Sequence, residues 1–179
     1  MKLHVPIRLR WSDLDAYGHV NNAEMLRLLE EARIQAFWLT DEENGSVFFD
    51  TADRPAAGAS TAVGASTAIG ASTAVLDGRP GADTLTLIAR QEIEHLAPVP
   101  YLRQPIDVRL WLGKLGGASL EVCYEVWSPV GVDPSVLYAR ASTTIVLVDA
   151  ASDRPRRIND TERAAWTPYL DEPIEFRRR

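Results

Sequence analysis

The feature that most constrains this chain is a single helical pattern near the N-terminus that is apolar on most of its circumference. Between about Ala23 and Leu39, apolar residues recur at the spacing of one helix face: Met25, Leu28, Leu29, Ala32, Ala36 and Leu39. Four more apolar residues widen that face: Leu26, Ile34, Phe37 and Trp38. A helix of this kind must be enclosed by other elements over much of its surface, so the rest of the chain has to supply the cover.

Almost all of the remaining pattern is typical of strands. Five segments show strand patterns: Val5–Trp11, Leu85–His95, Ile106–Leu115, Leu120–Trp127 and Leu137–Val148. The first and third alternate clearly, and the Gly116-Gly117 pair predicts a hairpin between the third and the fourth. The first is expected to bury Val5, Ile7, Leu9 and Trp11 on one side. A short closing helix is expected at Asp160–Trp166. This order predicts an α+β fold in which one long helix lies against an antiparallel sheet. The edge strands of such a sheet are free to pair with a second copy of the chain.

A repetitive segment interrupts this order. The run Gly58–Val75 contains three copies of a six-residue unit built from Gly, Ala, Ser and Thr with one Val or Ile each. So few apolar side chains do not offset the entropy of ordering the backbone. With its flanks, residues 50–83 are interpreted as an insertion into one domain that spans residues 1–179; an ordered short repeat is the alternative.

Composition excludes several classes of function. The chain has 179 residues, with 19 Lys and Arg against 25 Asp and Glu, a net charge of −6. This balance argues against nucleic acid as the partner. One cysteine, Cys123, excludes an internal disulfide, and three scattered histidines make a metal site improbable. With no long apolar run, no membrane span is expected, and a cytoplasmic location is the expectation.

The segment Trp11–Asn22, W-S-D-L-D-A-Y-G-H-V-N-N, carries the chemistry. Asp15 lies just before the helix N-terminus, where free N–H groups with partial positive charge polarise a carbonyl. Asp15 is therefore a candidate nucleophile or base, and Gly18 permits a positive φ. The alternative is structural: Asp, Asn and Gly are common as caps and turn formers. Asn21 is expected to cap the helix, with Glu24 completing a capping box.

The motif S-D-L-D-x-x-G-H-V-N-N, followed by Glu30-Glu31-Ala32-Arg33, resembles the acyl-CoA thioesterases of the 4-hydroxybenzoyl-CoA thioesterase type and the motif of plant acyl-carrier-protein thioesterases. The run R-Q-E-I-E-H-L-A-P, Arg90–Pro98, is similar to a strand of that family. The resemblance implies a hotdog fold, a long central helix wrapped by an antiparallel sheet, and pairing into dimers.

The same resemblance implies site residues. Asp15 matches the catalytic carboxylate, the N–H of Asn22 matches the group that polarises the thioester carbonyl, and His19 matches the histidine of the plant-type motif. Tyr17 stands where the plant-type enzymes have an asparagine, which is a departure from the motif. Tyr17, Gly18 and Asn21 are expected to contact substrate, and Arg90 and Ser119 are candidates for the phosphates of coenzyme A. Asp13 is expected to be structural.

The implied reaction is hydrolysis of acyl-CoA to free acid and coenzyme A, with coenzyme A entering only as part of the substrate and with no other cofactor. Asp15 either attacks the carbonyl or activates water, and the sequence does not separate the two. A homodimer is expected and a tetramer is an alternative. The competing hypothesis is a non-catalytic hotdog domain that binds or senses acyl groups.

Overall fold

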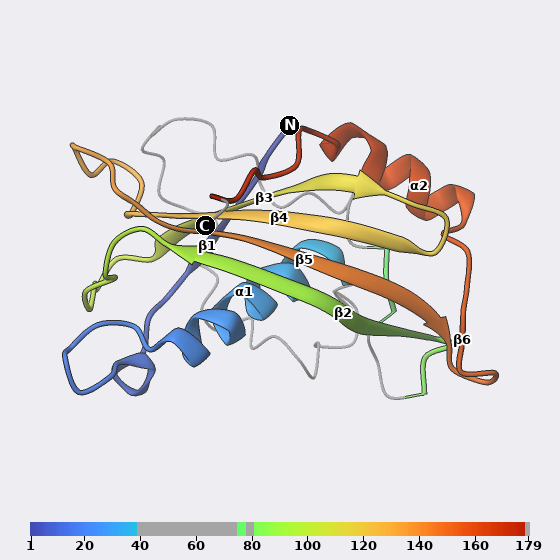
Figure 1. The fold of residues 1–179 in the computed structure, drawn as a ribbon, viewed down its shortest axis with the longest axis horizontal. Coiled ribbons are helices and arrows are strands. Elements are labelled where there is room, and N and C mark those ends of the chain that lie inside the picture. Colours follow the sequence, from blue (N-terminus) through green and yellow to red (C-terminus); the bar gives the residue numbers. More distant parts are fainter. Residues whose placement is uncertain (39–74, 78–80, 178–179) are drawn as a thin grey trace, which may run out of the picture.

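The computed structural model describes residues 1–38, 75–77 and 81–177. Its centre is one antiparallel sheet in the strand order β1-β3-β4-β5-β2, with β6 paired to β5 (Figure 1). The strands are β1 (Leu3–Ile7), β2 (Thr84–His95), β3 (Ile106–Leu115), β4 (Ser119–Trp127), β5 (Leu137–Asp149) and β6 (Arg154–Pro155). Every strand pair is antiparallel. The four later strands predicted from the sequence are confirmed to within one residue at their ends.

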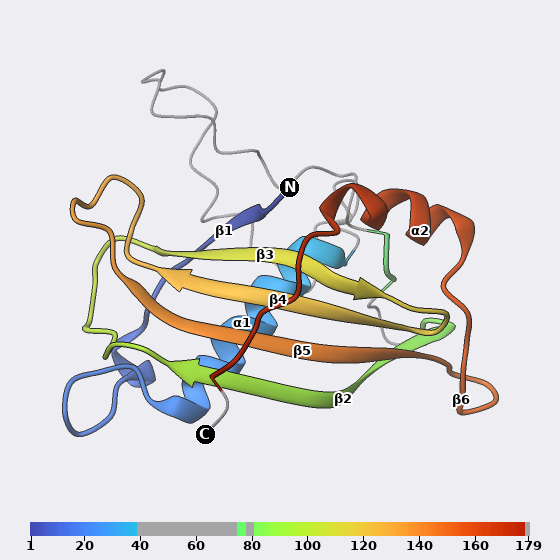
Figure 2. The same ribbon diagram turned by 45° about the horizontal axis from the view of Figure 1, so that its top comes forward.

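Helix α1 (Asn22–Phe37) crosses one face of this sheet (Figures 1 and 2). Its sixteen residues correspond to a length of about 24 Å. It buries the apolar face expected from the sequence: Met25, Leu28, Leu29, Ala32, Ala36 and Phe37. An antiparallel sheet with one helix on its face fits the expected hotdog fold. The predicted end of the helix at Leu39 and nearly all of the Gly/Ala/Ser/Thr-rich insertion lie outside the described residues.

The first predicted strand is wrong at its end. β1 stops at Ile7, and Trp11 begins a short 3-10 helix, η1 (Trp11–Asp13), with 77% of its surface exposed. The reason is Asp13, whose carboxylate accepts a hydrogen bond from the backbone N–H of Arg10 at 2.7 Å, while its own N–H donates to the Arg10 carbonyl at 3.0 Å. These bonds turn the chain away from the sheet before the strand alternation reaches Trp11.

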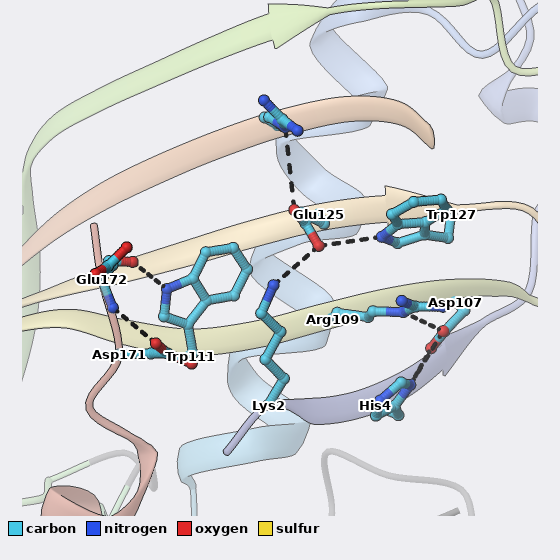
Figure 3. Close-up of polar contacts among 10 residues, drawn as sticks. Lys2, His4, Asp107, Arg109, Trp111, Glu125, Trp127, Asp171 and Glu172 are labelled. Carbon is cyan, nitrogen blue, oxygen red and sulfur yellow. Dashed lines mark hydrogen bonds and ion pairs between the residues drawn. The ribbon is translucent and has the colours of Figure 1, made fainter. Parts of the chain in front are cut away.

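The opposite face of the sheet is occupied by paired charges and by the C-terminal segment. Figure 3 shows two polar groups on it: Lys2 pairs with Glu125, and Asp107 pairs with Arg109 and contacts Nδ1 of His4 at 3.0 Å. The indole N–H of Trp111 donates to the carbonyl of Glu172 at 2.8 Å, which fixes the chain that follows α2 (Asp160–Trp166) and η3 (Thr167–Tyr169) against β3. This face therefore has a structural explanation, and the candidate site lies at the end of the sheet where α1 begins.

Candidate active site at the start of α1

The loop before α1 is organised by a buried carboxylate. Asp13 is fully buried, and its Oδ1 accepts a hydrogen bond from Nη2 of Arg27 at 2.6 Å. The carbonyl of Asp13 accepts a hydrogen bond from the N–H of Asn21 at 2.9 Å. These contacts tie both ends of the loop to the first turns of the helix, so the structural role expected of Asp13 is confirmed.

Asp15 lies inside this loop and is held by its neighbours. Its Oδ1 accepts hydrogen bonds from the N–H of Tyr17 at 2.8 Å and of His19 at 3.2 Å. Its backbone N–H donates to the carbonyl of His19 at 2.8 Å, and the turn between them uses Gly18 at φ 77°. A side chain with a Cβ rarely adopts that backbone conformation, so the glycine is required by the turn. Within the described residues Oδ2 of Asp15 accepts no hydrogen bond, which leaves one carboxylate oxygen for a ligand.

The N-terminus of α1 opens beside this carboxylate. Asn21 is the N-cap, and its side-chain oxygen accepts a hydrogen bond from the N–H of Ala23 at 2.8 Å. The N–H of Asn22, the first helical residue, has no partner among the described residues. Unpaired N–H groups at this position carry the positive end of the helix dipole.

The predicted capping box at this helix is wrong. Glu24 binds Nε of Arg27 at 2.6 Å instead of reaching back to the N-cap. The donor that a capping box would satisfy, the N–H of Asn21, is already taken by the carbonyl of Asp13. The reciprocal contact with Glu24 is therefore not needed.

The second wall of the site comes from a distant part of the chain. The N–H of Val20 donates to the carbonyl of Val99 at 2.9 Å, and His19 forms a β-bridge with Pro100. The bend after β2 is fixed by the carbonyl of Tyr138, which accepts hydrogen bonds from the N–H groups of both Leu96 and Ala97. These contacts place the end of β2 opposite the start of α1.

A cavity of about 310 Å³ lies between the two walls. One wall consists of Asp15, His19, Val20, Asn22 and Met25, and the other of His95, Leu96, Ala97, Pro98 and Val99. The structure thus brings together the three residues that the motif marks as catalytic candidates. It adds His95, the last residue of β2, which is not among the site residues predicted from the sequence. His95 lies just before the bend at residues 96–98, and nothing in the local sequence marks it as a site residue. Its place in the site follows only from the segment that packs opposite it.

The remaining candidates do not line this cavity. Tyr17 is 85% exposed at the loop tip, and Gly18 and Asn21 are exposed beside it. Arg90 lies in the middle of β2 and forms an ion pair with Glu92. Ser119 begins β4, at the end of that strand away from α1's N-terminus. This chain alone does not bring Arg90 or Ser119 to Asp15, and their roles stay predictions.

Two buried groups outside the cavity have raised pKa values. Burial raises the pKa of the Cys123 thiol to about 11. Burial also raises the pKa of Tyr124, whose hydroxyl accepts a hydrogen bond from Nη1 of the buried Arg33 at 3.2 Å. Among the described residues, no group of three or more His, Cys, Asp or Glu side chains is placed to hold a metal ion. No helix in the described ranges is long and apolar enough to cross a membrane.

The family of the chain is shown by its sequence. The sequence model of the thioesterase-like superfamily matches residues 9–166, which include both walls of the cavity. The chain belongs to this superfamily. No curated protein matches this superfamily member significantly in sequence.

Solved structures resemble this thioesterase-like chain over nearly its whole length. The PA5185 protein from Pseudomonas aeruginosa superposes with a TM-score of 0.65 at 20% identity, covering 97% of this chain and 94% of that one. A predicted thioesterase from Bacillus stearothermophilus gives 0.64 at 18% identity, covering 97% and 100%. A thioesterase from Thermus thermophilus, solved with coenzyme A and Zn, gives 0.59 at 21% identity, covering 96% of each chain. At these identities the likeness shows a shared fold.

Proposed function

We propose that this protein is a thioesterase that hydrolyses acyl-CoA to the free acid and coenzyme A in the cavity between α1 and the end of β2. The observation that carries the proposal is that one cavity holds both a carboxylate, Asp15, and the N-terminus of α1 at Asn22, whose N–H has no partner in the described part of the chain. Thioester hydrolysis needs both a group that delivers oxygen and a group that stabilises the oxyanion. Membership of the thioesterase-like superfamily supports the same reaction.

In the proposed mechanism the thioester carbonyl faces the N–H of Asn22, and the helix dipole stabilises the charge that develops on its oxygen. In one route Oδ2 of Asp15 attacks the carbonyl carbon. The C–S bond breaks, coenzyme A leaves as thiolate, and water hydrolyses the resulting anhydride. In the other route Asp15 takes a proton from water, which attacks the carbonyl directly. Thiols ionise near pH 8.5, so neither route needs a strong acid for the leaving group.

The two histidines and the exposed tyrosine have supporting roles in this proposal. His19 and His95 line the cavity on opposite walls, and we propose that they contact water or the bound thioester. Tyr17, Gly18 and Asn21 form the exposed rim of the loop, where we propose that they contact the substrate. No metal or redox cofactor enters the proposed reaction.

Coenzyme A as the carrier is supported by the Thermus thermophilus neighbour, whose structure contains it. We also propose a homodimer, with a tetramer as an alternative, formed through the free edge of β2. This strand ends the sheet, and it exposes three apolar side chains: Leu85, Leu87 and Ile88. An exposed apolar edge strand pairs readily with a second copy. Arg90 and Ser119, which lie away from Asp15 here, would then reach substrate only in the partner's cavity.

The test is release of thiol from a panel of straight-chain, branched and aromatic acyl-CoAs. Asp15→Ala and Asp15→Asn are expected to lower kcat/KM by roughly 100- to 10,000-fold, the range typical of general base catalysis. Asp160→Asn, an exposed aspartate on α2, is the control and should be unchanged. If the wild type releases no thiol from any member, the enzyme proposal fails and a non-catalytic acyl-binding domain remains. If both Asp15 variants keep full activity, the site assignment is wrong.

A single turnover in ¹⁸O-labelled water separates the two routes. Label recovered in Asp15 identifies the anhydride, because water can then attack the carboxyl carbon of the enzyme. Label found only in the free acid, with no acyl-enzyme trapped by hydroxylamine, identifies Asp15 as the base.

A further inference from the structure

The start of η1 carries an aromatic side chain that the fold does not use. Trp11 is 77% exposed, and its one ring contact among the described residues is with Tyr101, itself 43% exposed. The two rings meet edge to face, with centroids 5.7 Å apart and planes at 74°. Buried area is the main reason for keeping a tryptophan in a fold. An indole left this open has a ring surface available for a planar ligand.

This aromatic pair belongs to the two segments that build the candidate site. Trp11 lies in the loop that carries Asp15, and Tyr101 follows Val99, which lines the cavity. The two segments are joined by the hydrogen bond from Val20 to Val99 and by the His19–Pro100 bridge. A ligand with a flexible arm can therefore bind at the aromatic pair with one end and enter the cavity with the other.

The two chain segments that carry the pair are basic although the protein is acidic. Arg8, Arg10 and Arg103 are exposed on the same two segments, and none of them forms an ion pair with a described residue. No Asp or Glu occurs in residues 5–12 or 96–106. The net charge of the whole chain is −6, so three exposed arginines and no carboxylate within these two short stretches form a local exception. Guanidinium groups of this kind favour phosphate ligands.

We propose that Trp11, Tyr101, Arg8, Arg10 and Arg103, together called the aromatic–basic patch, bind the nucleotide end of coenzyme A. The adenine ring stacks on Trp11, and the arginines bind the 3′-phosphate and the diphosphate. The pantetheine arm then carries the thioester to Asp15. This inference rests on the proposed thioesterase function. It selects a nucleotide-bearing carrier over an acyl carrier protein, which presents the pantetheine arm without adenine.

Direct binding tests the patch without any catalysis. Adenosine 3′,5′-bisphosphate is titrated into wild type, Trp11→Ala, Trp11→Phe and Arg10→Gln by calorimetry. Trp11→Ala is expected to weaken binding roughly 5- to 150-fold, the loss typical when a base loses its aromatic stacking partner. Trp11→Phe should restore most of the affinity, and Arg154→Gln, an exposed arginine on β6, should match wild type. Because Trp11 is exposed, these variants should melt at the wild-type temperature.

Steady-state kinetics test whether the aromatic–basic patch contributes to binding of the acyl-CoA substrate. The same acyl group is supplied as acyl-CoA and as the truncated acyl-N-acetylcysteamine, which has no nucleotide. Trp11→Ala should raise KM for acyl-CoA by the factor seen in binding and leave kcat/KM for the truncated substrate unchanged. Equal losses on both substrates overturn the proposal, as does a wild type that does not bind the bisphosphate. A wild type that binds it in the patch but releases no thiol supports the nucleotide site and refutes the proposed hydrolysis instead.

Discussion

Replacing Asp13 with alanine is expected to destabilise the whole N-terminal end of the fold. The fully buried carboxylate accepts two short hydrogen bonds, from Nη2 of Arg27 at 2.6 Å and from the N–H of Arg10 at 2.7 Å. Each of these hydrogen bonds to a charged group contributes roughly 1.5–3 kcal/mol. The Arg27 side chain is 38% exposed and can regain water, which reduces its share. The sum is a loss of about 3 kcal/mol, or about 6–12 °C in Tm for a domain of this size.

Urea unfolding followed by tryptophan fluorescence measures this loss. Glu24→Ala is the matched control, because Glu24 binds the same arginine at 2.6 Å but is more exposed and should cost under about 1 kcal/mol. If Asp13 and Arg27 act as a pair, removing Arg27 from the Asp13→Ala variant should cost little. The double variant Asp13→Ala/Arg27→Ala should then be at most about 0.5 kcal/mol less stable than Asp13→Ala. A loss below about 1 kcal/mol for Asp13→Ala, or additive losses in the double variant, would refute the argument that this pair holds the loop.

Three further predictions follow from other contacts. Gly113→Ala places a Cβ 2.8 Å from Sγ of Cys123 and 3.0 Å from Cα of Pro173, so it should lower the free energy of unfolding in urea by about 1–3 kcal/mol. Gly117→Ala, with open space around its Cβ, is the control and should lower it far less. Equal losses would contradict the close packing of the C-terminal segment. Cys123, buried and with a pKa raised to about 11, should resist a disulfide reagent at pH 8 until the protein is unfolded, and rapid labelling of native protein would contradict this. Hydrogen bonds from Ser152 lower the pKa of Asp149 in the folded protein, so its ionised form stabilises the fold at pH values above the pKa of the unfolded state, and this stabilisation is lost as the pH falls through the folded pKa. Asp149→Asn should therefore lower Tm at pH 7 and match the wild-type Tm at acid pH. An unchanged Tm at pH 7 would contradict this prediction.

Much of the candidate site could be predicted because it is local in sequence. Asp15, His19 and Asn22 lie within one loop and the helix start that follows it, so turn chemistry and helix capping indicate their proximity directly. The Asn21 cap and the positive φ of Gly18 are confirmed for the same reason. The capping box failed because the competing partner, the carbonyl of Asp13, is decided by how the loop folds back.

Trp11 shows that hydrophobic periodicity does not predict where a strand ends. Alternation from Val5 onward predicts a buried side chain at Trp11, but alternation reports which face a residue would take if the strand continued. Whether it continues depends on hydrogen bonds that the pattern does not encode. Here Asp13 supplies them, since its side chain and backbone both bond to Arg10.

The sequence by itself determined the kinds of element, their order and the loop that bears Asp15, because periodicity, caps and turns are properties of neighbouring residues. Tertiary structure alone decided the second wall. His95 lines the same cavity as Asp15 because Val20 and His19 pair with the segment around Val99 and Pro100. It also decided that Arg90 and Ser119 lie elsewhere in this chain and that Trp11 and Tyr101 meet at the surface. Contacts between residues far apart in sequence depend on strand register and loop closure, which no local pattern specifies.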